Sequence, residues 1–187
     1  MKKIKLFIRV IGIGSFLAIA AIVYLFATGH LPVKEVEAVA VEVEIPTVDI
    51  IRQLAPRVDP AVALQIAEAI DASSSKYDLP KNLVACMIWR ESGFSPLAVS
   101  SKDCIGLGQI NYKYPAHAEK IKERGLSYAE VFHIANNVDL ACQILAENRQ
   151  HTKDMDGALQ MYVGKAHPTY VNDVYAALGR VSAGRHQ

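Results

Sequence analysis

Apolar residues recur at intervals of three and four along most of the chain after residue 56, a spacing typical of amphipathic helices. The predicted helices cover residues 60–73, 82–92, 115–124, 137–145, 155–162 and 167–178, with a short additional helix after Ser127. No run of alternating apolar and polar positions competes with them there. Residues 56–187 are therefore predicted to form one all-α domain of about 130 residues, large enough for its own core.

Capping residues support several of these boundaries. Asp59 is predicted to be an N-cap, with Pro60 at the first position of the helix. Ser127 and Glu130 have the spacing of a capping box at the start of another helix. Asn137 is predicted to be the N-cap of a helix with a clean apolar stripe. Four glycines are predicted to end helices: Gly93, Gly125, Gly164 and Gly179.

The amino-terminal part has a different pattern. Four basic residues within the first nine positions precede residues 10–28, which carry no charge. A helix of about 19 residues spans roughly the 30 Å hydrocarbon core of a bilayer. The positive-inside rule then makes residues 1–30 a cytoplasmic tail and membrane anchor, with the rest in the periplasm. The alternative is a cleavable signal peptide, suggested by Ala18-Ile19-Ala20, but the length of the apolar run favours an anchor.

Residues 31–55 are predicted to be a linker. Val39, Val41, Val43 and Ile45 alternate with small or acidic residues, so the segment could be an extended strand. An isolated strand has no partner, and a solvated acidic spacer is the favoured interpretation.

The net charge and the cysteine spacing give no indication of a nucleic-acid or metal ligand. The net charge is +1, which gives no indication of nucleic-acid binding. Three cysteines, Cys86, Cys104 and Cys142, show no metal-site spacing, and neither a metal nor another cofactor is expected. In an oxidising compartment we hypothesise a Cys104–Cys142 disulfide, with Cys86 as a small buried side chain.

Glu91 is the strongest candidate for chemistry. It follows Leu83 and Met87 at intervals of four, so it continues an apolar face of its predicted helix. It also falls in the last turn before Gly93, where the helix macrodipole disfavours an anion. Both effects raise the pKa of a carboxyl group, and a carboxylic acid that stays protonated near neutral pH can donate a proton to a leaving oxygen.

The segment that follows has the features of a ligand-binding loop. Gly106 and Gly108 allow the main chain to approach a ligand closely, and Gln109 offers a donor and an acceptor. The elements Glu91-Ser92-Gly93-Phe94, Ala98-Val99-Ser100-Ser101 and Ile105-Gly106-Leu107-Gly108-Gln109-Ile110 together resemble the signature of the soluble-lytic-transglycosylase (SLT) domain of the lysozyme-like superfamily.

The resemblance continues along the chain with departures. The run from Asn137 to Leu145 resembles the family's Asn-Ile-x-x-Gly helix, with Ala141 where glycine is usual. Residues 158–164 resemble its Ala-Tyr-Asn-Ala-Gly motif and retain Tyr162, but Val163 replaces the asparagine. Residues 170–171 resemble a Tyr-Val pair of the last helix. Gly108 replaces a common methionine and is expected to open the floor of the cleft.

The resemblance implies a lysozyme-like helical fold and cleavage of the β-1,4 bond between N-acetylmuramic acid and N-acetylglucosamine in peptidoglycan. Glu91 would protonate the glycosidic oxygen and then accept the proton of the muramyl C6 hydroxyl, which closes a 1,6-anhydro ring. The residues carried over as substrate-binding are Ser92, Gly108, Gln109, Ile110, Asn137 and Tyr162.

Alternatives remain for the function and for single residues. Asp103 could be the second carboxylate of a hydrolytic muramidase, although a loop aspartate beside Lys102 is more often solvated. The protein could also be a non-catalytic peptidoglycan-binding component of a secretion or pilus apparatus. Ser92 could simply belong to a helix cap and Tyr162 to the core.

Overall fold

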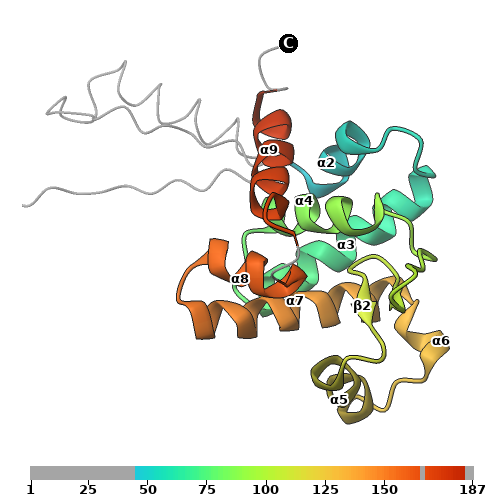
Figure 1. Cartoon of the computed structure of the whole chain (residues 1–187). Helices are drawn as coiled ribbons and strands as arrows, with labels where there is room; N and C mark the ends of the chain where they lie inside the picture. The colour runs from blue at the N-terminus through green and yellow to red at the C-terminus, as the bar shows by residue number, and fades with distance from the viewer. Residues whose placement is uncertain (1–44, 165–166, 184–187) are drawn as a thin grey trace, which may run out of the picture. The chain divides into compact units, whose positions relative to one another are not determined.

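The structure, a computed structural model, describes residues 45–164 and 167–183. These residues form mainly helices, as expected, with one small hairpin (Figure 1). The elements are α2 (Thr47–Leu54), α3 (Pro60–Lys76), α4 (Lys81–Ser92), β1 (Cys104–Ile105), β2 (Ile110–Asn111), α5 (Pro115–Glu123), α6 (Tyr128–Val131), α7 (Ile134–Thr152), α8 (Met155–Val163) and α9 (Tyr170–Ala183).

Helix α4 lies at the centre of the domain. All six residues from Leu83 to Ile88 are buried, because α2, α3 and α9 pack around this helix (Figure 1). A helix that is apolar on all sides is stable only where neighbours cover every face. Helix α7 packs against α3 and α8 and completes the core. This packing fixes the last turn of α4, which carries Glu91.

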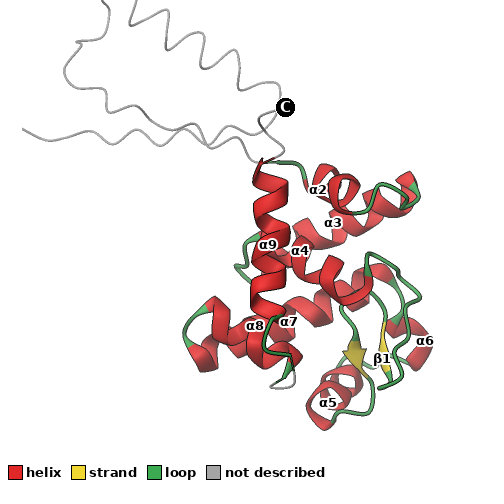
Figure 2. Ribbon diagram, turned by 45° about the horizontal axis from the view of Figure 1, so that its top comes forward, coloured by secondary structure: helices red, strands yellow, loops and turns green. Residues whose placement is uncertain are grey.

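The hairpin was not predicted from the sequence. Strands β1 and β2 pair antiparallel, Cys104 with Asn111 and Ile105 with Ile110, and Val99 forms an isolated bridge with Ile105. Figure 2 shows the strands beside α5 and α6. Two residues per strand are too few for a visible alternation in the sequence. The pairing fixes the loop between the strands, residues 106–109.

Most predicted helix ends are confirmed. The Asp59 side chain accepts hydrogen bonds from the amides of Ala61 and Val62, at 2.9 and 3.1 Å. Gly93 is left-handed, with φ 61°, and ends α4. The capping box of Ser127 and Glu130 is present at the start of α6.

Three sequence-based boundaries were wrong. His133, not Asn137, is the N-cap of α7, so Asn137 lies inside that helix. Helix α9 starts at Tyr170 and continues through Gly179 to Ala183. Apart from the two chain neighbours and the backbone of the same helix, no atom comes within 4 Å of a Cβ built on Gly179, and the φ of Gly179 is not in the left-handed region. A glycine without a left-handed backbone is only a weak interruption of a helix.

The predicted linker also ends earlier than residue 55, because Thr47–Leu54 form α2. Thr47, Ile50, Ile51 and Leu54 have the i, i+3, i+4, i+7 spacing of an apolar helix face, and Ile50 and Ile51 are fully buried. Thr47 Oγ1 donates a 2.5 Å hydrogen bond to Asp71 Oδ1 of α3. The alternation over residues 39–44 lies outside the described residues.

The predicted anchor, residues 1–30, also lies outside the described residues. Within the described part of the chain, no helix combines the length and the apolar character that a membrane span requires.

The hypothesis of a Cys104–Cys142 disulfide was wrong, because all three cysteines are free thiols. Cys142 is fully buried in α7, and burial raises its pKa to about 12. The Cys104 thiol instead lies 3.8 Å from the carbonyl oxygen of Lys102 in its own loop. Cys104 is only half-buried, in β1, whereas Cys142 is fully buried in α7.

Candidate active site

Glu91 lies in the last turn of α4 and is partly buried. The helix ends directly after it, where the amide of Gly93 donates a 2.8 Å hydrogen bond to the carbonyl oxygen of Trp89. The carboxyl group therefore lies close to the carbonyl end of the helix and at the boundary between core and surface. This is the position that the spacing of Leu83, Met87 and Glu91 predicts.

Burial raises the pKa of Glu91 to about 7. A hydrogen bond from Tyr170 and the positive charge of Arg90 act in the opposite direction, but they offset only part of this effect. At neutral pH the group is then present in substantial amounts both as the acid and as the carboxylate. Such a group can give up a proton and take one back within one reaction cycle.

Tyr170, at the start of α9, is a site residue that the sequence reasoning missed. Its hydroxyl donates a hydrogen bond to Oε1 of Glu91. Burial, followed by the charge of Glu91, raises the pKa of Tyr170 far above its usual value, so the hydroxyl remains a donor. The resemblance of residues 170–171 to a family pair was the one signal that could have indicated this residue.

Arg90 contacts two residues of α9, Tyr170 and Asp173. Its guanidinium carbon lies 5.9 Å from the centre of the Tyr170 ring, and its Nε lies 3.1 Å from Oδ2 of Asp173, one turn later on α9. Asp173 therefore forms an ion pair with Arg90. This ion pair and the Tyr170–Glu91 hydrogen bond both connect the end of α4 to the start of α9.

Asn137 organises the loop between the strands. Its side-chain oxygen accepts a 2.7 Å hydrogen bond from the amide of Gly108, and its amide nitrogen donates to the carbonyl oxygens of Ile105 and Val131, at 3.1 and 2.9 Å. The side chain has no exposed surface. The side chain therefore cannot contact a substrate directly. Asn137 was expected to bind substrate, but its contacts instead give it the role of positioning the loop.

Gly108 lies against α7 and Tyr162, so its lack of a side chain does not open the cleft floor. A Cβ built at Gly108 would lie 2.5 Å from Cβ of Ala141 and 3.0 Å from the Tyr162 hydroxyl oxygen. That hydroxyl donates a 2.6 Å hydrogen bond to the Gly108 carbonyl oxygen. The space of the missing side chain is filled by Ala141, which stands where the family usually has glycine.

Gln109 and Ile110 also have mainly structural contacts. Gln109 has a positive φ of 49°, and its side-chain nitrogen donates to the carbonyl oxygens of Gly106 and Ala98, at 3.0 and 3.4 Å. Ile110 is fully buried in β2, so its side chain cannot touch a ligand. Gln109 is only partly buried and stays a candidate for substrate contact.

Ser92 and Tyr162 differ in where they point. The Ser92 hydroxyl donates to the carbonyl oxygen of Ile88 at 3.2 Å, one turn back on α4, as in an ordinary helix end. The charge of Glu91 contributes to the raised pKa of Tyr162, after the dominant effect of burial, so this ring lies near the carboxyl group. The structure therefore brings Glu91, Tyr162, Tyr170 and the loop at Gly108 together.

Asp103 is poorly suited to act as a second catalytic acid. Its side chain is 53% exposed and its Oδ2 lies 2.9 Å from Nζ of Lys113, so it forms a surface ion pair. Burial raises the pKa of Glu91, Tyr170 and Arg90 partly offset this rise, and no second carboxylate contributes to it. Nor do the described residues contain a group of three or more potential metal ligands.

Two hollows lie away from Glu91. One, of about 680 Å³, is lined by residues of α3 and of the turn from α6 into α7. The other lies beside α5 and is described below. Neither of these hollows is lined by Glu91, Tyr162 or Tyr170.

Comparison with known families gives a match to the transglycosylase SLT domain over residues 68–175. No match was found among curated proteins or among solved structures. The matched range begins in α3, ends in α9, and includes Glu91, the loop at Gly108 and both site tyrosines. It covers more than half of the chain, and the protein therefore belongs to the lysozyme-like transglycosylase SLT domain family.

Proposed function

We propose that this protein is a membrane-anchored lytic transglycosylase that cleaves the β-1,4 bond between N-acetylmuramic acid and N-acetylglucosamine and leaves a 1,6-anhydromuramic end. Membership of the SLT domain family supports transglycosylase action on peptidoglycan. The observation that carries the finer proposal is the pKa of about 7 at Glu91. It suits a residue that must act first as an acid and then as a base.

In the first step, protonated Glu91 donates its proton to the glycosidic oxygen, and the bond from that oxygen to C1 of the muramyl residue breaks. In the second step, the resulting carboxylate accepts the proton of the C6 hydroxyl as its oxygen forms a bond to C1. The two steps together leave Glu91 protonated again, because it regains the proton that it gave up. Tyr170 steadies the carboxylate between the steps through its hydrogen bond to Oε1.

The environment of the other acids favours this route over hydrolysis. A hydrolytic glycosidase needs a second carboxylate about 5–10 Å from the first. Asp103 is paired with Lys113, and Asp173 is paired with Arg90. Both acids lie in exposed ion pairs, and neither contributes to the raised pKa of Glu91.

Product analysis tests the reaction type. Purified sacculi are digested with the wild-type protein, Glu91→Gln and Asp103→Asn, and the fragments are analysed by mass spectrometry. We expect fragments ending in anhydromuramic acid, lighter by one water than hydrolytic fragments, from the wild type and Asp103→Asn. Glu91→Gln should yield none while still sedimenting with sacculi. Hydrolytic ends that disappear in Asp103→Asn would instead identify a muramidase.

Anchoring in the inner membrane, with the domain in the periplasm, is part of the same proposal. It is supported by the uncharged run at residues 10–28 and by the basic residues before it. The full chain should stay with membranes after a high-pH wash and be released by detergent. Release by the wash alone, or a shortened mature protein, would indicate a cleaved signal peptide.

A further inference from the structure

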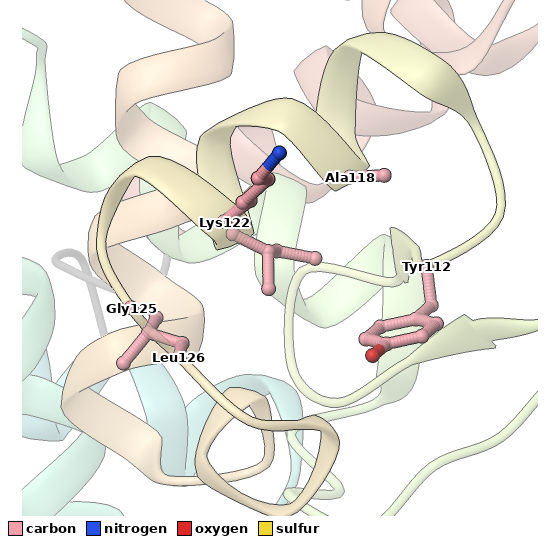
Figure 3. A pocket seen from close by; sticks show the side chains of 6 residues that line it. Tyr112, Ala118, Lys122, Gly125 and Leu126 are labelled. Atoms are coloured by element: carbon pink, nitrogen blue, oxygen red, sulfur yellow. The ribbon is translucent and has the colours of Figure 1, made fainter.

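A hollow of about 370 Å³ lies beside α5, apart from the residues at Glu91. It is lined by Tyr112, Ala118, Ile121, Lys122, Gly125 and Leu126. Figure 3 shows Tyr112 on one side, Gly125 and Leu126 on the other, and Lys122 projecting from α5. Its volume lies within the range of roughly 300–1,000 Å³ found for small-ligand sites.

The walls of this hollow are mainly apolar, and parts of them are packed against neighbouring side chains. Ile121 is 3% exposed and forms part of the floor. The Tyr112 ring packs edge-on against Tyr128, with 4.9 Å between the ring centres. Gly125 has no atom within 4 Å of the place where a Cβ would lie, so the rim is open there. The hollow thus offers small apolar groups a preformed surface.

The charge at the hollow comes from Lys122. Three neighbouring cations are already in ion pairs: Lys113 with Asp103, Lys120 with Glu147 and Arg124 with Asp139. Lys122 is exposed and has no acidic partner among the described residues. A cation beside an apolar hollow suits a ligand with small apolar groups and a carboxylate.

We propose that this hollow binds the peptide chains of peptidoglycan, taking a terminal alanine side chain against Ile121 and Tyr112 and the carboxylate at Lys122. The inference rests on the proposed function, because the same polymer supplies the glycan at Glu91 and the peptide. Tyr112 follows Gln109 by three residues, which span at most about 10 Å. A peptide several residues long can cover such a separation.

Calorimetry with a synthetic pentapeptide ending in D-alanyl-D-alanine tests the carboxylate contact. We expect the free acid to bind about tenfold more tightly than its C-terminal amide, the effect of one charge-assisted hydrogen bond. Lys122→Gln should remove this difference. The matched control is Lys153→Gln, which removes another exposed lysine near a helix carboxyl end and should keep it. Equal binding of acid and amide by the wild type, or no binding of either, would overturn the proposal.

Filling the hollow tests its location. Ala118→Leu places a larger side chain in the hollow, whereas Ala116→Leu makes the same change on the exposed face of α5. We measure the rate on peptide-bearing strands divided by the rate on strands stripped of peptide. Ala118→Leu should lower this ratio roughly threefold or more, and Ala116→Leu should not. An unchanged ratio in Ala118→Leu would contradict the assignment.

Failure of this inference can be told apart from failure of the proposed function. Anhydro products from peptide-free strands support the transglycosylase whatever happens at the hollow. If the wild type released no anhydro product from either kind of strand, yet bound the peptide acid through Lys122, the reaction would be wrong and the peptide site would stand.

Discussion

The hydroxyl of Tyr170 donates a hydrogen bond to Oε1 of Glu91, across 79 positions of sequence. Tyr170 is the first residue of α9 and Glu91 lies in the last turn of α4, so the packing of these two helices sets the chemistry of the acid. Burial raises the pKa of Glu91 and Tyr170 limits the rise. The acid and its tyrosine partner therefore form one unit, in which each side chain alters the proton affinity of the other.

Tyr170→Phe should move the pH–rate profile to higher pH. The hydrogen bond stabilises the carboxylate, and its loss makes Glu91 hold its proton more tightly. A hydrogen bond to a charged group contributes about 1.5–3 kcal/mol, or roughly one to two pH units. The measurement is kcat/KM from pH 5 to 9. Tyr175→Phe removes a hydroxyl that bonds to Asp156 on the surface, and it should leave the profile in place.

An unshifted profile in Tyr170→Phe, with a folded protein, would show that the hydrogen bond does not govern the acid. A loss of activity at every pH, without a shift of the pH–rate profile, would show that Tyr170 serves only to pack α9 against α4.

Glu91 should make the fold less stable as the pH rises. Its pKa is raised from 4.5 to about 7 on folding, so the folded state binds the extra proton between these values. Stability from this group is complete below pH 4.5 and is lost as the pH rises through 7, by up to about 3 kcal/mol. Glu91→Gln removes the titration. Its free energy of unfolding should exceed that of the wild type at pH 8 and match it near pH 4, as measured by urea denaturation.

Asn137→Ala should destabilise the domain by about 2–4 kcal/mol. The change leaves the Gly108 amide and two carbonyl oxygens without their buried partner. Asn136→Ala is the neighbouring control, because within the described residues the Asn136 amide donates a single hydrogen bond, to the Glu130 carbonyl oxygen, and is less buried. Urea unfolding of both variants gives the comparison, and an equal loss in the two would argue against the loop-positioning role of Asn137.

Gly108 and Ala141 should behave as a coupled pair. Gly108→Ala crowds Ala141 and should cost about 1–3 kcal/mol, and Ala141→Gly should cost about 1 kcal/mol of helix propensity. The double variant should lose less than the sum, because it relieves the 2.5 Å contact. Gly179→Ala, where nothing lies within 4 Å, should be neutral or stabilising. Additive losses in the pair would contradict the packing described here.

Sequence reasoning predicted features that depend on local signals. Asp59, Gly93 and the Ser127–Glu130 box each act within one helical turn, and their roles are confirmed. The position of Glu91 on an apolar face followed from the four-residue spacing of its own helix. A raised pKa followed from that spacing, because burial is its main cause.

Features that depend on contacts between distant segments were missed or misjudged. The partnership of Tyr170 with Glu91 requires knowing how α9 packs on α4. Asn137 was taken for a cap because its helix was started too late, and for a substrate ligand because of the family resemblance, whereas its three hydrogen bonds reach the strand loop and the end of α6. The space at Gly108 was expected to be open because the compensating Ala141 lies in α7, far along the chain from this loop.

The most direct test of this account is the titration of the Glu91 carboxyl group by carbon NMR, with Glu91→Gln used to assign its signal. We predict a midpoint near pH 7 in the wild type. A midpoint near 4.5, the value of an ordinary glutamate, would show that Glu91 is a carboxylate at neutral pH and would contradict its role as the proton donor.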